Sequence, residues 1–107
     1  MNVVWSPHAN NLFLDILAQI EAALSIEDAY RWRERILDDA DRLADFPFSG
    51  PIVPVECFHT IPANADRLRQ VIVKPYRIVY EPVDDEIHIL SIRHSRMLVT
   101  RDDTVWN

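Results

Sequence analysis

Apolar residues recur at three- and four-residue intervals between positions 9 and 24, the spacing of one face of an amphipathic helix. Ser6 is a common N-cap, and Pro7 suits the first helical position because its missing amide needs no partner there. We therefore predict a short strand over Asn2–Trp5 and then a helix. Its apolar stripe comprises Ala9, Leu12, Phe13, Ile16, Leu17, Ile20 and Leu24.

The pattern restarts at Ser25, and a second helical stripe runs as far as Leu43. Ser25 and Asp28 form a variant of the capping box, in which aspartate replaces the usual glutamate. Two prolines and the only glycine lie between residues 46 and 51, and they end this helix. The short link between the helices predicts an antiparallel hairpin. We expect the second helix to bury Ala29, Trp32, Ile36, Ala40 and Leu43.

Three strand-like runs occupy the second half of the chain, at residues 68–73, 76–83 and 86–92. Their short connections predict antiparallel neighbours. Residues 52–66 contain two prolines and no clear period, so we interpret them as a loop. The chain is predicted to be a single α+β domain over residues 1–107, in the order β-α-α-β-β-β. A helical hairpin packs on one face of a small, mainly antiparallel sheet.

The composition fits one small domain, because 107 residues, 49% of them hydrophobic, suffice for a single core. Cys57 is the only cysteine and cannot form an internal disulfide, which is typical of a reducing cytoplasm. The first residues do not resemble a signal peptide, and no apolar run reaches the roughly 18 residues that cross a bilayer. We expect a cytoplasmic protein. Cys57 and His59 lack further ligands at suitable spacing, so we expect neither a metal nor another cofactor.

Charge is distributed unevenly along the chain. The net charge is −6; residues 1–48 contribute −5, whereas residues 67–101 carry +3. An acidic protein binds polyphosphates poorly, because that affinity comes from releasing counterions to basic side chains. The basic second half can still present a local positive face to an acidic partner. Six of its seven bases are arginines, which are the better donors of forked hydrogen bonds.

Four short segments carry more specific information. They are Trp5-Ser6-Pro7-His8-Ala9, Leu43-Ala44-Asp45-Phe46-Pro47 with Ser49-Gly50, Tyr76-Arg77-Ile78-Val79-Tyr80, and Ile92-Arg93-His94-Ser95-Arg96. In this order and at these spacings they resemble the RelE/ParE superfamily of bacterial type II toxins. The resemblance implies that a cognate antitoxin neutralises the protein by wrapping its C-terminal segment around it. RelE-like members are ribosome-dependent endoribonucleases, whereas ParE-like members poison DNA gyrase.

Cleavage of RNA at the 2′-oxygen needs a base, an acid and a cation at the phosphate. By resemblance, Arg77 matches the arginine that faces the scissile phosphate in RelE, and a nuclease would also use His94 and Arg96. Leu68 and Gln70 stand where RelE has paired lysines, and its C-terminal tyrosine has no counterpart. This departure and the acidic net charge place the sequence nearer ParE. We expect a non-enzymatic gyrase inhibitor, with a ribosome-dependent mRNA endoribonuclease as the alternative.

The resemblance also predicts a binding surface and a partner. The partner is a ParD-like antitoxin, which forms a hetero-oligomer with the toxin and docks an amphipathic C-terminal helix on the hairpin. A structural alternative pairs Arg77 with an acid across the strands, such as Glu81 or Glu86, and places Tyr76 and Tyr80 in the core. A third possibility is a non-toxic module that retains only antitoxin binding. The predicted binding surface is a basic concave patch on the sheet face opposite the helices, formed by Arg69, Arg77, Arg93 and Arg96.

Overall fold

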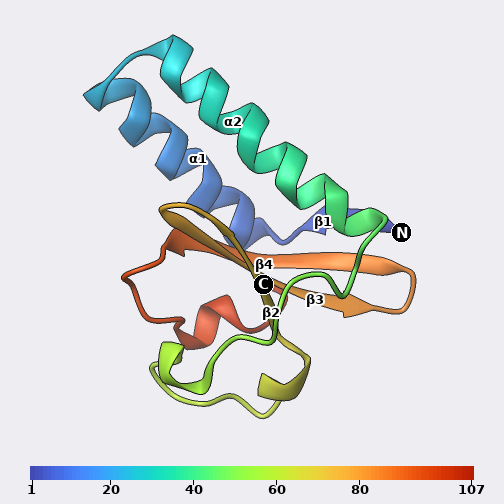
Figure 1. The fold of residues 1–107 in the computed structure, drawn as a ribbon. Coiled ribbons are helices and arrows are strands. Elements are labelled where there is room, and N and C mark those ends of the chain that lie inside the picture. Colours follow the sequence, from blue (N-terminus) through green and yellow to red (C-terminus); the bar gives the residue numbers. More distant parts are fainter.

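The computed structural model describes all 107 residues and contains a four-stranded sheet with a helical hairpin on one face (Figure 1). The strand order is β1-β4-β3-β2, with β1 parallel to β4 and the other neighbours antiparallel. The predicted order β-α-α-β-β-β and the helical hairpin on a mainly antiparallel sheet are confirmed. The elements are β1 (Asn2–Trp5), α1 (Pro7–Ala23), α2 (Ile26–Asp41), β2 (Arg69–Val73), β3 (Tyr76–Val83) and β4 (Glu86–His94).

Both helices begin at the predicted serine caps. Ser6 Oγ accepts a hydrogen bond from the Ala9 amide at 3.0 Å. Ser25 Oγ accepts from the Asp28 amide at 3.0 Å and donates to the Asp28 carboxylate at 2.7 Å. Each cap satisfies an amide that has no partner inside its helix. Only Leu24 and Ser25 separate the helices, and neither helix is long and apolar enough to cross a membrane.

The larger hydrophobic core lies between the hairpin and the sheet. Trp5 stacks on Phe13 with 4.9 Å between the ring centroids, which attaches α1 to the first strand. Tyr80 is fully buried in this core and Tyr76 is half-buried at its edge, as predicted. The buried members of the cluster are Ala9, Phe13, Ile36, Ala40, Leu43, Val73, Ile78, Tyr80, Ile87, Ile89 and Ile92.

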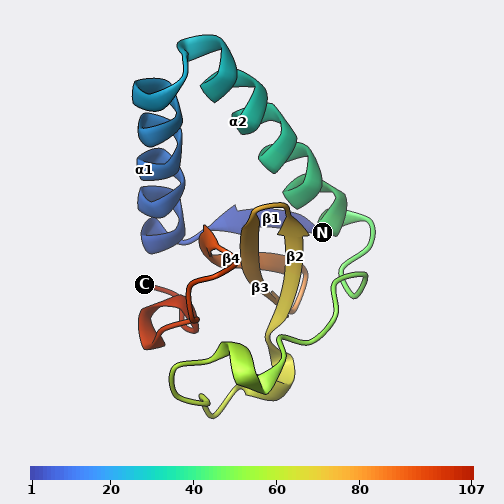
Figure 2. The same ribbon diagram turned by 60° about the vertical axis from the view of Figure 1, so that its left-hand side comes forward.

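The opposite face of the sheet is also covered, so the prediction of a basic concave patch on this face is wrong. Residues 52–66 and 97–104 lie across it as mostly irregular segments, visible below the sheet in Figure 2. A parallel bridge between Phe58 and Val99 joins the two segments. Apolar residues of β3 and β4 point to this side of the sheet, and burying them requires a cover. The second cluster comprises Val53, Phe58, Leu68, Val79, Leu90 and Val99.

A tyrosine ties the link after α2 to the sheet. The Tyr80 hydroxyl donates to the Pro47 carbonyl oxygen at 2.9 Å and accepts from the Gly50 amide at 3.1 Å. Burial raises the pKa of Tyr80, so the hydroxyl keeps its proton at neutral pH. A Cβ atom at Gly50 would lie 2.4 Å from the Gln70 carbonyl oxygen. The only glycine of the chain therefore stands where no side chain fits.

A candidate partner-binding groove

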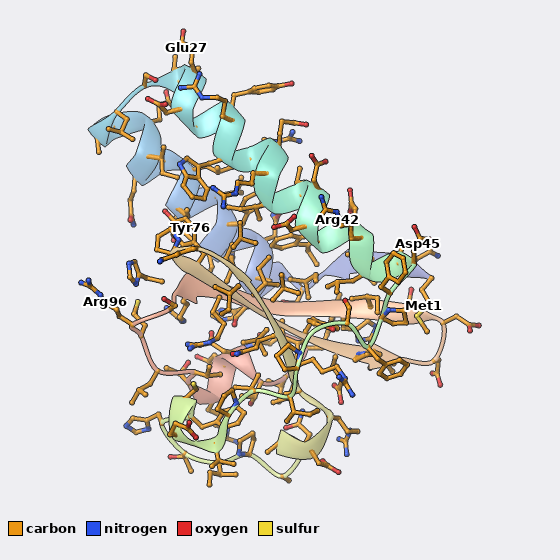
Figure 3. All side chains as sticks on the ribbon, in the orientation of Figure 1. Met1, Glu27, Arg42, Asp45, Tyr76 and Arg96 are labelled. Atoms are coloured by element: carbon orange, nitrogen blue, oxygen red, sulfur yellow. The ribbon has the colours of Figure 1, made fainter.

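A groove of about 350 Å³ lies between α1 and the adjacent ends of β3 and β4. Most of its lining is apolar, and its rim carries both basic and acidic side chains. In Figure 3, Tyr76 lies beneath the hairpin at this end of the sheet, and Arg96 extends outward beside it. The lining residues are Leu12, Asp15, Ile16, Gln19, Tyr76, Ile92, Arg93, His94 and Met97.

A row of aromatic rings extends from the groove to α2. Trp32 meets the edge of Tyr76 with 5.4 Å between ring centroids, and Tyr76 meets His94 edge-on at 6.4 Å. Arg35 lies 5.0 Å from the centre of the Trp32 ring, within range of cation–π attraction. Burial raises the pKa of Tyr76, so its hydroxyl also stays protonated. Within the groove, Tyr76 and His94 supply aromatic surface and Arg93 supplies positive charge; Trp32 and Arg35 extend this surface beyond it.

Arg93, at the groove, is held by a buried aspartate that the sequence analysis missed. Arg93 Nε donates to Asp103 Oδ2 at 2.8 Å, and His8 Nε2 lies 2.8 Å from Oδ1 of the same carboxylate. The Thr100 amide also donates to Asp103, at 3.0 Å. Burial raises the pKa of Asp103, but the hydrogen bonds from Arg93, His8 and Thr100 outweigh burial, and the pKa ends below its usual value. Asp103 therefore ties the C-terminal residues to α1 and β4.

Arg77 is an internal tether on the covered face of the sheet. Only 9% of it is exposed, too little for a surface cation that meets a partner. Its Nε donates to Gln70 Oε1 at 2.9 Å. The two terminal nitrogens donate to the Met97 carbonyl oxygen at 3.2 Å and to Cys57 Sγ at 3.4 Å. These contacts join β2 and β3 to both covering segments.

The acids considered as partners of Arg77 bind other side chains, so that alternative is wrong. Glu81 accepts from Arg67 Nε at 2.9 Å. Glu86 lies 3.1 Å from His88 Nε2. The Arg77 guanidinium is instead satisfied by neutral groups of the covering segments and β2.

The four predicted arginines do not form one continuous patch. Arg69 stands opposite Tyr80 in the sheet, so its side chain projects from the face that packs against the helices. The Arg77 side chain points to the opposite face, which the irregular segments cover. Arg69 donates to the Gly50 carbonyl oxygen at 2.8 Å and lies 4.9 Å from the centre of the Phe48 ring. Arg93 is one of the residues that line the groove. Arg96 is exposed, makes no ion pair, and directly precedes the lining residue Met97.

The three residues weighed for nuclease chemistry are not gathered around one point. His94 stands opposite Tyr76, whose ring packs on the helix side, whereas Arg77 points to the other side of the sheet. His94 Nδ1 accepts the Arg96 amide at 3.1 Å, and the Arg96 side chain is exposed. The sheet therefore separates the Arg77 guanidinium from the His94 imidazole.

Comparisons with known proteins agree with the fold and the predicted branch. The sequence matches the family described as "ParE toxin of type II toxin-antitoxin system, parDE" over residues 3–99. A solved chain of the "Chromosomal ParDE TA system from P. aeruginosa" superposes with a TM-score of 0.69 at 18% sequence identity, over 88% of this chain and 95% of that chain. A search of curated proteins finds no match. Because the family match spans both helices and all four strands, the chain belongs to the ParE toxin family of type II toxin–antitoxin systems.

Proposed function

We propose that this protein inhibits DNA gyrase in the cytoplasm, and that a ParD-like antitoxin neutralises it by binding in the groove. Membership of the ParE family carries the proposal. The groove supports the second half of it, because an apolar hollow with arginines beside it suits a segment that is apolar on one side and acidic on the other.

An amphipathic helix is the segment that fits the groove best. Its apolar side packs on Leu12, Ile16 and Tyr76. Acidic residues beside that stripe face Arg93 and Arg96. Asp103 already accepts Nε of Arg93, so only the terminal nitrogens of that guanidinium remain for a partner. Arg96 has its whole guanidinium available and contributes more to the attraction.

The burial and internal hydrogen bonds of Arg77 favour inhibition by binding over RNA cleavage. A cation that stabilises a phosphate in the transition state must reach it, and this guanidinium donates to three groups of its own protein. The His94 side chain lies on the other side of the sheet. Leu68 and Gln70 stand where RelE has lysines, and Leu68 is fully buried.

The test of the target uses purified gyrase and living cells. We expect the purified protein to inhibit supercoiling of relaxed plasmid DNA. In bacteria that are pulse-labelled after induction, DNA synthesis should fall before protein synthesis does. An earlier fall in protein synthesis, with cleaved mRNA, would contradict gyrase inhibition and indicate a ribosome-dependent nuclease. Antitoxin binding without any growth arrest would indicate the non-toxic module.

The test of the groove reverses one charge at its rim. Arg96→Glu should weaken binding of the cognate antitoxin by at least about tenfold, because it places a like charge opposite the antitoxin's acids. Arg42→Glu is the matched control, since Arg42 is an exposed arginine that follows α2, outside the groove. Titration calorimetry measures both affinities. Equal affinities for the two variants would show that the antitoxin binds elsewhere.

A further inference from the structure

The turn of the helical hairpin carries three large apolar side chains that no other part of the protein covers. Leu24 and Ile26 are each 67% exposed, and Tyr30 is 61% exposed, so each could still bury most of its surface in a partner. Leu24 follows α1, whereas Ile26 and Tyr30 lie one turn apart on α2. We refer to these three residues as the hairpin tip. Figures 1 and 2 show the hairpin turn standing clear of the sheet and of the segments that cover its other face.

Folding does not account for the hairpin tip. Ile20 on α1 and Ala29 on α2 are the buried residues nearest to the turn on either side, so the hairpin extends beyond its own core. Polar residues at the tip would remove no buried contact. Adjacent exposed apolar side chains favour association with other molecules, and they mark interaction sites when they persist in a folded protein.

The hairpin tip is held in one conformation before any partner binds. The Leu24 amide donates to the Ile20 carbonyl oxygen at 2.8 Å, and the Ala29 amide donates to the Ser25 carbonyl oxygen at 3.1 Å. Ser25 also caps α2 through Asp28. A preformed, convex surface loses little conformational entropy on binding. Such a surface suits insertion into a concave pocket, where buried side chains contribute most of the affinity.

Acidic side chains border the hairpin tip and limit its partners. Glu21 and Glu27 are exposed and make no ion pair, and the nearest base, Arg31, is already bonded to Asp28. This border repels nucleic acid and anionic membrane surfaces. Two tips facing each other in a symmetric dimer would place like charges together. The same border repels the acidic segment that suits the groove.

We propose that the hairpin tip docks in an apolar pocket, bordered by basic residues, on the protein that the toxin inhibits. The inference rests on the proposed function, because it assigns the target to the tip and the antitoxin to the groove. The two partners then bind different ends of the molecule. An antitoxin in the groove neutralises the toxin by obstructing the approach of the larger target, or by holding it in a complex, without covering the tip.

The experiment compares the double variant Leu24→Ser/Ile26→Ser with Leu14→Ser. Leu14 is the matched control because it is a large apolar residue of α1 that is 54% exposed and lies outside the tip and the groove. We expect the double variant to inhibit gyrase supercoiling at least about tenfold less potently, because it removes two anchors from the pocket. Antitoxin affinity and the thermal midpoint should stay at wild-type levels. Glu21→Lys/Glu27→Lys should also lose potency, since it reverses the border.

The outcomes separate this inference from the proposed function. If the double variant inhibits gyrase as potently as the wild type, the proposal that the hairpin tip binds the target is wrong, whereas gyrase inhibition itself stands. If the double variant loses as much antitoxin affinity as gyrase potency, the proposal is also wrong, because the tip would then be part of the antitoxin-binding surface. If the wild-type protein arrests growth without inhibiting gyrase, the proposed target is wrong, and growth arrest becomes the readout for the same variants. A wild-type protein that does neither overturns both proposals.

Discussion

The two faces of the sheet are covered in different ways. Capped helices cover one face over a cluster of 11 buried side chains, whereas mostly irregular segments cover the other over a cluster of 6. On the first face, apolar packing holds the two helices against the sheet, and the Tyr80 hydroxyl binds only the link after α2. On the second face, the smaller cluster is supplemented by Arg77 and Asp103, whose hydrogen bonds hold the segments down. A small domain can therefore use polar tethers where it lacks the residues for a second helical layer.

The largest expected loss of stability, and the sharpest test of this comparison, comes from substituting one core residue on each face of the sheet. Ile78 and Leu90 are 0% and 1% exposed on neighbouring strands, and they belong to the helix-side and outer clusters respectively. Ile78→Ala should lower the free energy of unfolding by an amount near the top of the usual range of about 2–5 kcal/mol. Leu90→Ala should lower the free energy of unfolding by an amount near the bottom of this range, because the irregular segments can move into the cavity that the substitution leaves. Urea denaturation followed by circular dichroism measures both; equal costs would contradict the comparison.

The next effect concerns the polar tether of the outer face. Asp103→Asn should lower the free energy of unfolding at neutral pH by about 1.5–3 kcal/mol, the usual value of hydrogen bonds to a charged group. Asp102→Asn is the control, because Asp102 is exposed and makes no ion pair. Urea denaturation of both variants at pH 7 gives the comparison. A cost no larger than that of the control would show that packing alone holds this face.

The pH dependence of Asp103 has a definite sign. Its pKa in the folded protein is below the usual value, so the carboxylate stabilises the fold above the unfolded-state pKa of about 3.9. That contribution is lost as the pH falls through the lowered pKa. The difference in unfolding free energy between wild type and Asp103→Asn should therefore narrow in acid. A constant difference between pH 7 and pH 2 would contradict this.

The smallest effect concerns the link that runs beside the sheet. Gly50→Ala should cost about 1–3 kcal/mol, because its Cβ would press on the Gln70 carbonyl oxygen and on the Tyr80 ring. Thermal denaturation provides the measurement. The control is Ser49→Ala, which removes only an exposed hydrogen bond to the Phe46 carbonyl oxygen. Equal thermal midpoints for the two variants would contradict this prediction. They would show that the link after α2 can shift to accommodate a Cβ atom despite its two hydrogen bonds to Tyr80.

The helix-side layer could be predicted from the sequence because its signals are local. The apolar stripe of α1 repeats with the helical period, and Ser6 and Ser25 mark the caps within three residues of their partners. The outer layer has no such signal. Phe58 and Val99 lie in segments without a period, and they meet only because the chain folds back across the sheet.

The groove and its tethers show the same limit. Arg93, His94 and Arg96 could be identified as a basic segment, but Asp103 could not be recognised as the partner of Arg93. The bond between Asp103 and His8 spans 95 residues. Arg77 could be interpreted as a surface cation because an arginine in a strand is usually exposed. Its burial depends on Cys57 and Met97, which approach it only in the folded chain.

The parallel pairing of β1 with β4 has a consequence for biosynthesis. Asn2 pairs with Glu86, so the first strand to leave the ribosome must wait for the last one. Until then the apolar stripe of α1 has no sheet to cover, and the groove has no floor. Such long-range pairing slows folding relative to domains with local contacts. We therefore expect the nascent chain to stay harmless during translation, so that an antitoxin made beforehand can meet each toxin molecule as its fold is completed.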